Sequence, residues 1–185
     1  MEFLRDHFLI AMPNMCDPRF SQTLTYLCEH NAQGAMGLVV NRPLQLSLST
    51  LLEQVAIPLS ATMATDPPVY AGGPVQTDHG FILHRSPPDT FAATLQVTDE
   101  IGVTTSQDIL QALAKGEGPA EFLVAIGYAG WGPGQLEKEL AENAWLTVGA
   151  DPNTLFRVPA AARLQAAADH LGVNLQLLAP EGGRA

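Results

Sequence analysis

The stretch Gly127-Tyr128-Ala129-Gly130-Trp131-Gly132-Pro133-Gly134-Gln135-Leu136-Glu137 sets a large aromatic residue among glycines, between an apolar run and a helical pattern. The apolar run at 122–128 has the length of a strand. A helix is expected to begin near Gln135, because Leu136 and Leu140 lie four residues apart on one helical face. The stretch therefore predicts a strand, a shaped glycine-rich turn and a helix, in that order.

Other apolar runs of strand length lie on both sides of this stretch, most of them in the first two thirds of the chain. We expect strands in the following segments: 8–12, 24–28, 35–40, 69–71, 81–84, 93–97, 145–148, 155–158 and 173–178.

Helical periodicity also begins at Leu48, where Thr50 and Glu53 have the spacing of a capping box and Pro58 would end the helix.

Two further helices are expected. One spans 106–115 and ends at Gly116, and the other spans 159–171 and ends at Gly172, since glycine adopts the left-handed conformation that stops a helix. The second should place Leu171 on its apolar face, together with Leu164, Ala167 and Ala168. Short strands with helices at irregular intervals predict an α+β fold rather than a regular doubly wound sheet.

The chain has 185 residues, of which 46% are hydrophobic, so it can bury a real core and fits one domain. Its 16 glycines and 14 prolines are spread along the chain, which indicates many turns rather than a linker. We expect a single domain over 1–179, followed by a frayed tail over 180–185.

The chain is acidic, with 19 Asp and Glu against 9 Lys and Arg and a formal net charge of -10. Because the basic residues are scattered, direct nucleic-acid binding is disfavoured. The apolar segment 8–12 is too short for a signal or spanning segment. We therefore expect a soluble, cytoplasmic protein that does not associate with membranes.

Two glycine-rich features could serve structure or function. Glycines ahead of a helix allow close approach of a ligand, and Trp131 could offer a stacking face. The alternative is a structural turn with a packed tryptophan, since Gly130 and Gly132 match no phosphate-binding pattern. The second feature, Gly72-Gly73, has the same two interpretations, and if the two features met they would form a concave lip.

The five histidines lack the spacing of a metal site, so we expect no metal and no cofactor. His30 and His84 stand at strand ends, where both site residues and ordinary polar caps occur. No nucleophile elbow or Ser, His and acid order supports nucleophilic catalysis.

The two cysteines differ in context. Cys28 alternates with Leu24 and Tyr26, as a small core residue would. Cys16 lies in a turn-rich segment that we expect to be exposed, where oxidation is feasible. Cys16 is therefore a candidate redox residue.

An ordered set of motifs resembles the bacterial YqgE/AlgH family over nearly the whole chain. These motifs are Met12-Pro13, Asp17-Pro18-x-Phe20, Glu29-His30-Asn31, Gly34-Ala35-Met36-Gly37-Leu38-Val39-Val40-Asn41-Arg42-Pro43, Gly72-Gly73-Pro74-Val75, Gly127-Tyr128-Ala129-Gly130-Trp131, Gly134-Gln135-Leu136-Glu137-x-Glu139-Leu140 and Asn143-x-Trp145.

The resemblance implies an α+β fold in which a bent, bifurcated sheet curls into a pseudo-barrel with helices packed outside. It brings no catalytic residue set, and some family members are linked to transcriptional control of exopolysaccharide production. From the motifs, together with the strand-end residue His84, we single out a candidate ligand or partner surface: Asp17, His30, Asn41, Arg42, Gly72, Gly73, His84, Gly130, Trp131 and Gln135.

Three hypotheses follow. The first is a non-enzymatic regulatory or binding protein that acts on transcription indirectly, through a protein partner or small ligand. The second is a small-molecule-binding domain or enzyme with its site at the Gly72-Gly73 and Gly130-Trp131-Gly132 turns. The third is a thiol-based redox sensor that uses Cys16.

Overall fold

The computed structural model describes residues 2–61, 63, 65–87 and 89–178. The chain divides into two compact units, the first formed by 1–41 and 129–185 and the second by 42–128. The division falls inside strand β9 (Glu121–Trp131), so both units use this strand. The expected single domain over 1–179 stays a prediction, and the expected tail lies outside the described residues.

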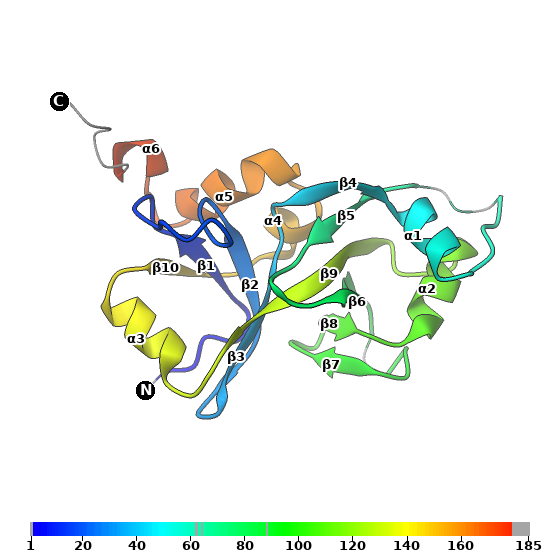
Figure 1. The fold of residues 1–185 in the computed structure, drawn as a ribbon, viewed down its shortest axis with the longest axis horizontal. Helices are drawn as coiled ribbons and strands as arrows, with labels where there is room; N and C mark the ends of the chain where they lie inside the picture. The colour runs from blue at the N-terminus through cyan, green and yellow to red at the C-terminus, as the bar shows by residue number, and fades with distance from the viewer. Residues whose placement is uncertain (1, 62, 64, 88, 179–185) are drawn as a thin grey trace. The chain divides into compact units, whose positions relative to one another are not determined.

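The first unit contains an antiparallel sheet. Its strand order is β10 (Trp145–Gly149), β1 (His7–Ala11), β2 (Leu24–Asn31), β3 (Gly34–Val39) and the last residues of β9. Its helices are α3 (Gln135–Ala141), α4 (Pro152–Phe156), α5 (Ala160–Asp169) and α6 (Leu175–Leu178), with α5 lying against β1 and β2 (Figure 1).

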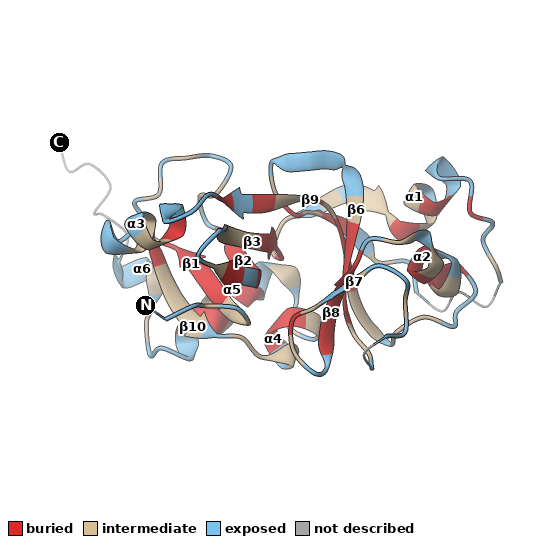
Figure 2. Cartoon of the chain, turned by 90° about the horizontal axis from the view of Figure 1, so that it is seen from below, coloured by how far each residue is buried: buried red, intermediate tan, exposed pale blue. Residues whose placement is uncertain are grey.

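Strand β1 is buried on both faces, which explains why it reads as a continuous apolar run rather than an alternating one. Figure 2 shows the same deep burial in β2. One core cluster of this unit comprises Leu9, Ala11, Leu27, Ala129, Trp131, Leu136 and Trp145.

The second unit carries the remaining elements: β4 (Pro43–Ser47), α1 (Leu48–Gln54), β5 (Pro68–Ala71), β6 (Val75–Arg85), β7 (Thr94–Gln96), β8 (Ile101–Thr104) and α2 (Gln107–Ala114). Strands β7, β8, β6 and β9 are antiparallel in that order. Strand β5 pairs in parallel with β9, and β4 pairs with β5. Leu48, Leu52, Ile82 and Ile109 are among the most buried residues of its core.

Strand β9 has three strand partners, so the strand order branches there. Val124 pairs with both Val69 of β5 and Ile82 of β6, while residues 129–131 pair with β3. The α+β class is thereby confirmed, and the branching agrees with the bifurcated sheet that the family resemblance implies.

The first part of the glycine-rich stretch, residues 127–131, is not a turn, because strand β9 continues to Trp131. Gly127 has a φ of 75°, and a Cβ there would lie 2.3 Å from the carbonyl oxygen of Gly73, so glycine permits a close backbone crossing within a strand. The turn is confined to 132–134, and Gly134, at a φ of 74°, is the N-cap of α3.

Two strand predictions near the C-terminus are wrong. Segment 155–158 begins inside helix α4, because Asp151 caps the helix through the backbone N–H of Thr154 and Pro152 occupies its first turn. Segment 173–178 contains the short helix α6. Both segments are apolar but short, and periodicity alone does not separate strand from helix at that length.

Two helix details also differ. The N-cap of α1 is Ser47, whose hydroxyl accepts from the backbone N–H of Thr50, and not Thr50 itself. In α5 the buried residues include Arg163, whereas Leu171, expected on the apolar face, is 41% exposed beyond the helix end. The Arg163 guanidinium is satisfied by the carbonyls of Val40 and Val158, which allows its burial.

Candidate functional site

The tip of the β2–β3 hairpin and the end of β9 form the structural frame of the candidate site. Strand register places Glu29, Met36 and Gly130 side by side, and the next row contains His30, Ala35 and Trp131. Because successive side chains point to opposite faces of a sheet, the two rows face opposite sides.

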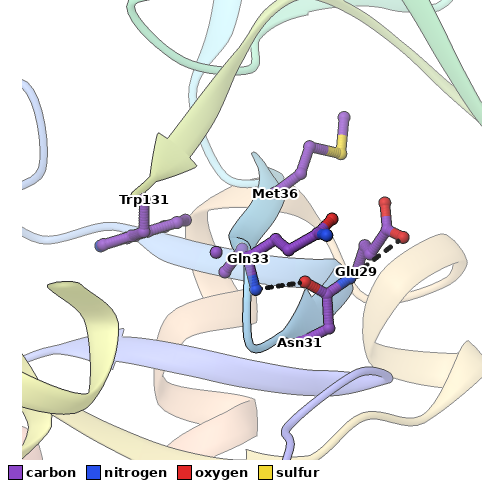
Figure 3. Close-up of a pocket in the computed structure, with 7 residues that line it drawn as sticks. Glu29, Asn31, Gln33, Met36 and Trp131 are labelled. Atoms are coloured by element: carbon purple, nitrogen blue, oxygen red, sulfur yellow. Dashed lines mark hydrogen bonds between the residues drawn. The ribbon is translucent and has the colours of Figure 1, made fainter. Parts of the chain in front are cut away.

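A surface pocket of about 230 Å³ lies at this frame. Its lining residues are Glu29, Asn31, Gln33, Gly34, Ala35, Met36 and Trp131. Figure 3 shows the side chains of Glu29, Gln33 and Met36 grouped together there, while the indole of Trp131 points away from them.

The pocket is rich in hydrogen-bond acceptors. The Asn31 carboxamide oxygen accepts from the backbone N–H of Gln33 at 2.8 Å, which shapes the hairpin tip (Figure 3). Glu29 is exposed, and its carboxylate accepts from Asn31 Nδ2 at the long distance of 3.5 Å. No basic residue lines the pocket, so Glu29 sets its charge.

Gly34 is required for the shape of the pocket. Its φ is 135°, and a Cβ at this position would lie 2.2 Å from the carbonyl oxygen of Trp131. The hairpin can therefore approach β9 this closely only because residue 34 has no side chain.

On the opposite face, His30 is held by two partners. Its Nδ1 accepts from the backbone N–H of Leu4 at 2.9 Å, so the ring proton resides on Nε2 and is donated to Glu137 at 2.6 Å. The imidazole is almost fully buried, and Phe3 packs edge-on against it. This arrangement ties the N-terminal segment and α3 to β2.

Glu137 stays ionised in this contact. Hydrogen bonding, first from its own backbone N–H and then from His30, lowers the pKa of the carboxyl below its ordinary value. The carboxylate also lies in the first turn of α3, where negative charge is favoured by the helix dipole.

Trp131 is a packed core residue. This agrees with the structural interpretation of the glycine-rich stretch, in which the tryptophan is packed and does not bind a ligand. Its side chain contacts Phe20 and Trp145, and the residue is 6% exposed. The indole N–H groups of Trp131 and Trp145 both donate to one oxygen of Glu139, at 3.2 and 3.1 Å. Its ring is therefore not free to stack on a ligand.

Gln135 also has a structural role. Its side-chain oxygen accepts from the backbone N–H of Gly132 at 3.0 Å, and its amide nitrogen donates to Glu139 at 3.2 Å. These bonds close the turn between β9 and α3.

The other candidates of the first unit lie elsewhere. Asn41 braces the start of β2, because its side chain accepts from Leu24 N–H and donates to the Gln22 carbonyl. Asp17 forms an ion pair with Arg19 at 2.8 Å. None of these residues lines the pocket.

The cysteines fit their expected settings. Cys16 is exposed, and its thiol lies 3.3 Å from the carbonyl oxygen of Asn14. Cys28 is fully buried, and burial strongly raises the pKa of its thiol.

The remaining candidates belong to the second unit. The carbonyl of Arg42 accepts from Ala71 N–H, and Gly72 N–H donates to the Ile126 carbonyl. Gly73 is the residue whose carbonyl oxygen lies against Gly127. The two glycine-rich features of the second hypothesis thus fall in different units.

His84 is buried in a network of hydroxyl groups. Its Nε2 lies 2.6 Å from Thr104 Oγ1, its Nδ1 contacts Ser86 Oγ, and Thr104 in turn contacts Thr94 at 2.7 Å. Burial lowers the pKa of His84, so the ring is neutral near pH 7.

The structure therefore brings Trp131 to the pocket, whereas His30 lies on the opposite face of the hairpin and Gln135 closes the turn that follows β9. Sequence reasoning missed the pocket residues Glu29, Gln33 and Met36 as a group, as well as the partners Glu137 and Glu139. Glu29 and Met36 were visible only as members of family motifs.

Within 2–61, 63, 65–87 and 89–178, no three His, Cys, Asp or Glu side chains gather as metal ligands would. No described helix is both long and apolar enough to cross a membrane. A more apolar pocket of about 330 Å³ lies beside α2 in the second unit, but none of the candidate residues lines it.

The fold and site define a small α+β protein with a branched sheet and an open, acidic hairpin pocket. The AlgH-like family model matches residues 8–176, and the chain belongs to this family.

Individual relatives agree with this assignment. The chain is 53% identical to a UPF0301 protein of Thiobacillus denitrificans, over 98% of this chain and 97% of the relative. It is 55% identical to a UPF0301 protein of Pseudomonas aeruginosa, over 99% and 96% of the two chains.

Two solved structures are similar to this one. The solution structure of the AlgH protein from Pseudomonas aeruginosa has a TM-score of 0.81 and 53% identity, covering 99% of this chain and 96% of that one. A crystal structure of a Corynebacterium diphtheriae protein has a TM-score of 0.72 at 16% identity, covering 97% of this chain and 93% of that one, and therefore shares the fold.

Proposed function

We propose that this protein is a non-catalytic cytoplasmic binding protein that acts on transcription indirectly, by engaging a protein partner at the hairpin pocket. The observation that carries the proposal is the pocket itself, where Glu29, Gln33 and Met36 present a carboxylate, an amide and a thioether to solvent.

The states of the two candidate histidines, His30 and His84, favour binding over catalysis at these positions. Both ring nitrogens of His30 and both of His84 are engaged by protein groups. A general acid or base needs a nitrogen within reach of a substrate proton, and neither imidazole offers one. The acidic charge of the chain favours an indirect route, because phosphate backbones are repelled.

The test is complementation of a strain that lacks the gene, read as its transcript profile. Wild-type protein should restore the profile, and Met36→Arg should not, because a long charged side chain would fill the pocket. Glu117→Arg introduces the same group at an exposed position of the second unit and should complement normally.

Thermal melting checks that both variants fold. Complementation by Met36→Arg at wild-type level would contradict the role of this surface. Tight, sequence-selective gel shifts by the purified protein at physiological salt would contradict the indirect route to transcription.

A further inference from the structure

The chemistry of the hairpin pocket narrows the partner that it can accept, and this step rests on the proposed function. Glu29 supplies a carboxylate and Gln33 an exposed amide, and the apolar lining residues are Ala35, Met36 and Trp131. A ligand that matches these groups carries positive charge and several hydrogen-bond donors on an apolar stem.

The size of the pocket points to one side chain. Sites for drug-sized ligands occupy roughly 300–1,000 Å³ and bury most of the ligand surface. At about 230 Å³ and open to solvent, this pocket is below that range. It can hold the end of a single long residue that the rest of a partner presents.

We propose that the pocket receives an arginine side chain of a protein partner. The planar guanidinium carries five donors and pairs with a carboxylate through two parallel hydrogen bonds. Its aliphatic stem would lie along Met36, and the carboxamide of Gln33 would accept a remaining donor. Lysine has a compact, strongly hydrated head and matches this spread of acceptors less well.

Charge complementarity supports the same occupant. The chain has a formal net charge of -10, so it attracts basic surfaces and speeds their encounter. The lining residues include no basic side chain, so the pocket does not favour an anionic ligand. A calcium ion would require more oxygen ligands than one carboxylate and the neighbouring amides provide.

The experiment is a titration of ¹⁵N-labelled protein with N-acetyl-arginine amide, followed by amide chemical shifts. The largest changes should fall on residues 29–36, with a dissociation constant on the order of millimolar, because a single exposed side chain makes few contacts. N-acetyl-citrulline amide, which has nearly the same shape without the charge, should cause no changes.

Variants test the assignment to Glu29. Glu29→Gln should weaken binding roughly five- to tenfold, because the charge-assisted pair is lost. Glu117→Gln removes the same charge at an exposed position away from the pocket and should bind like wild type. The spectra themselves report whether each variant is folded.

Several outcomes would overturn the inference: no changes at high ligand concentration, equal changes with the citrulline amide, or an unaltered affinity in Glu29→Gln. Tighter binding of free arginine than of the capped amide would overturn the commitment to a protein partner. If arginine fails while Met36→Arg still abolishes complementation, the surface is correct and its assigned chemistry is wrong. The proposed function itself would fail if Met36→Arg complements.

Discussion

Glu139 is the residue that orders the aromatic cluster behind the pocket. One carboxylate oxygen accepts from the indole N–H groups of both Trp131 and Trp145. Both indoles are nearly buried, so removing their acceptor leaves donors without partners.

We therefore expect Glu139→Ala to lower the free energy of unfolding by roughly 1–3 kcal/mol, the usual penalty for unsatisfied buried groups. Glu142→Ala, at the exposed end of the same helix, should change it by less than about 0.5 kcal/mol. Urea unfolding measures both variants. Equal effects would show that the shared acceptor has no special role.

The two cysteines should react at very different rates. Cys16 is exposed, whereas Cys28 is fully buried and burial raises its thiol pKa. Since the thiolate is the reactive form, a thiol reagent near neutral pH should label Cys16 in the folded protein and Cys28 only as the fold opens. Mass spectrometry over time resolves the two sites, and equal labelling would remove Cys16 as a candidate redox residue.

At the scale of elements, the buried His84 on strand β6 makes the stability of the fold depend on pH. Burial lowers the pKa of His84 in the folded state. As the pH falls, the imidazole is therefore protonated in the unfolded chain before it is protonated in the folded one. Stability from this group is present above the unfolded pKa, near 6.5, and is lost as pH falls below that value.

The free energy of unfolding should therefore fall as the pH drops below about 6.5, by at most ~1.4 kcal/mol per pH unit for this group. His84→Gln should flatten that part of the profile. Ser86→Ala, which keeps the imidazole, should retain the slope. An unchanged slope in His84→Gln would mean that other groups cause it.

Many helices and strands could be predicted from the sequence, because apolar runs and helix-ending glycines act through residues close together in the chain. The strand runs at 8–12, 24–28 and 35–40 correspond to β1, β2 and β3, and the glycine stop at Gly116 follows α2 as expected. Strand β8 was missed because Ile101-Gly102-Val103-Thr104 is short and interrupted by glycine.

The site was harder to predict because its parts are distant in sequence. His30 and Glu137 are 107 residues apart, and no propensity or spacing rule connects them. The glycine-rich stretch that begins at Gly127 suggested a turn, and Gly34 stood only within a family motif. Both positions serve close backbone approach, which depends on which strand lies alongside.

At the scale of the molecule, we propose that the two compact units unfold as one domain. The reason is β9, which forms the ladder with β3 in the first unit and with β5 and β6 in the second. Loss of either part would leave one stretch of this strand without its ladder partner.

Calorimetry should then give a single transition with an unfolding enthalpy of roughly 130 kcal/mol, from ~0.7 kcal/mol per residue. The van't Hoff enthalpy should equal the calorimetric one. A van't Hoff value near half of it, or two resolved transitions, would show that the units unfold independently.

The central claim is that the hairpin pocket engages a protein partner, and site-specific photocrosslinking in living cells tests it most directly. A photoreactive amino acid in place of Gln33, which lines the pocket, should produce a discrete crosslinked protein adduct, and the same substitution at Glu117 should not. The adduct should weaken when Glu29→Gln is introduced with it. Absence of an adduct at position 33, or the same adducts at both positions, would contradict the account.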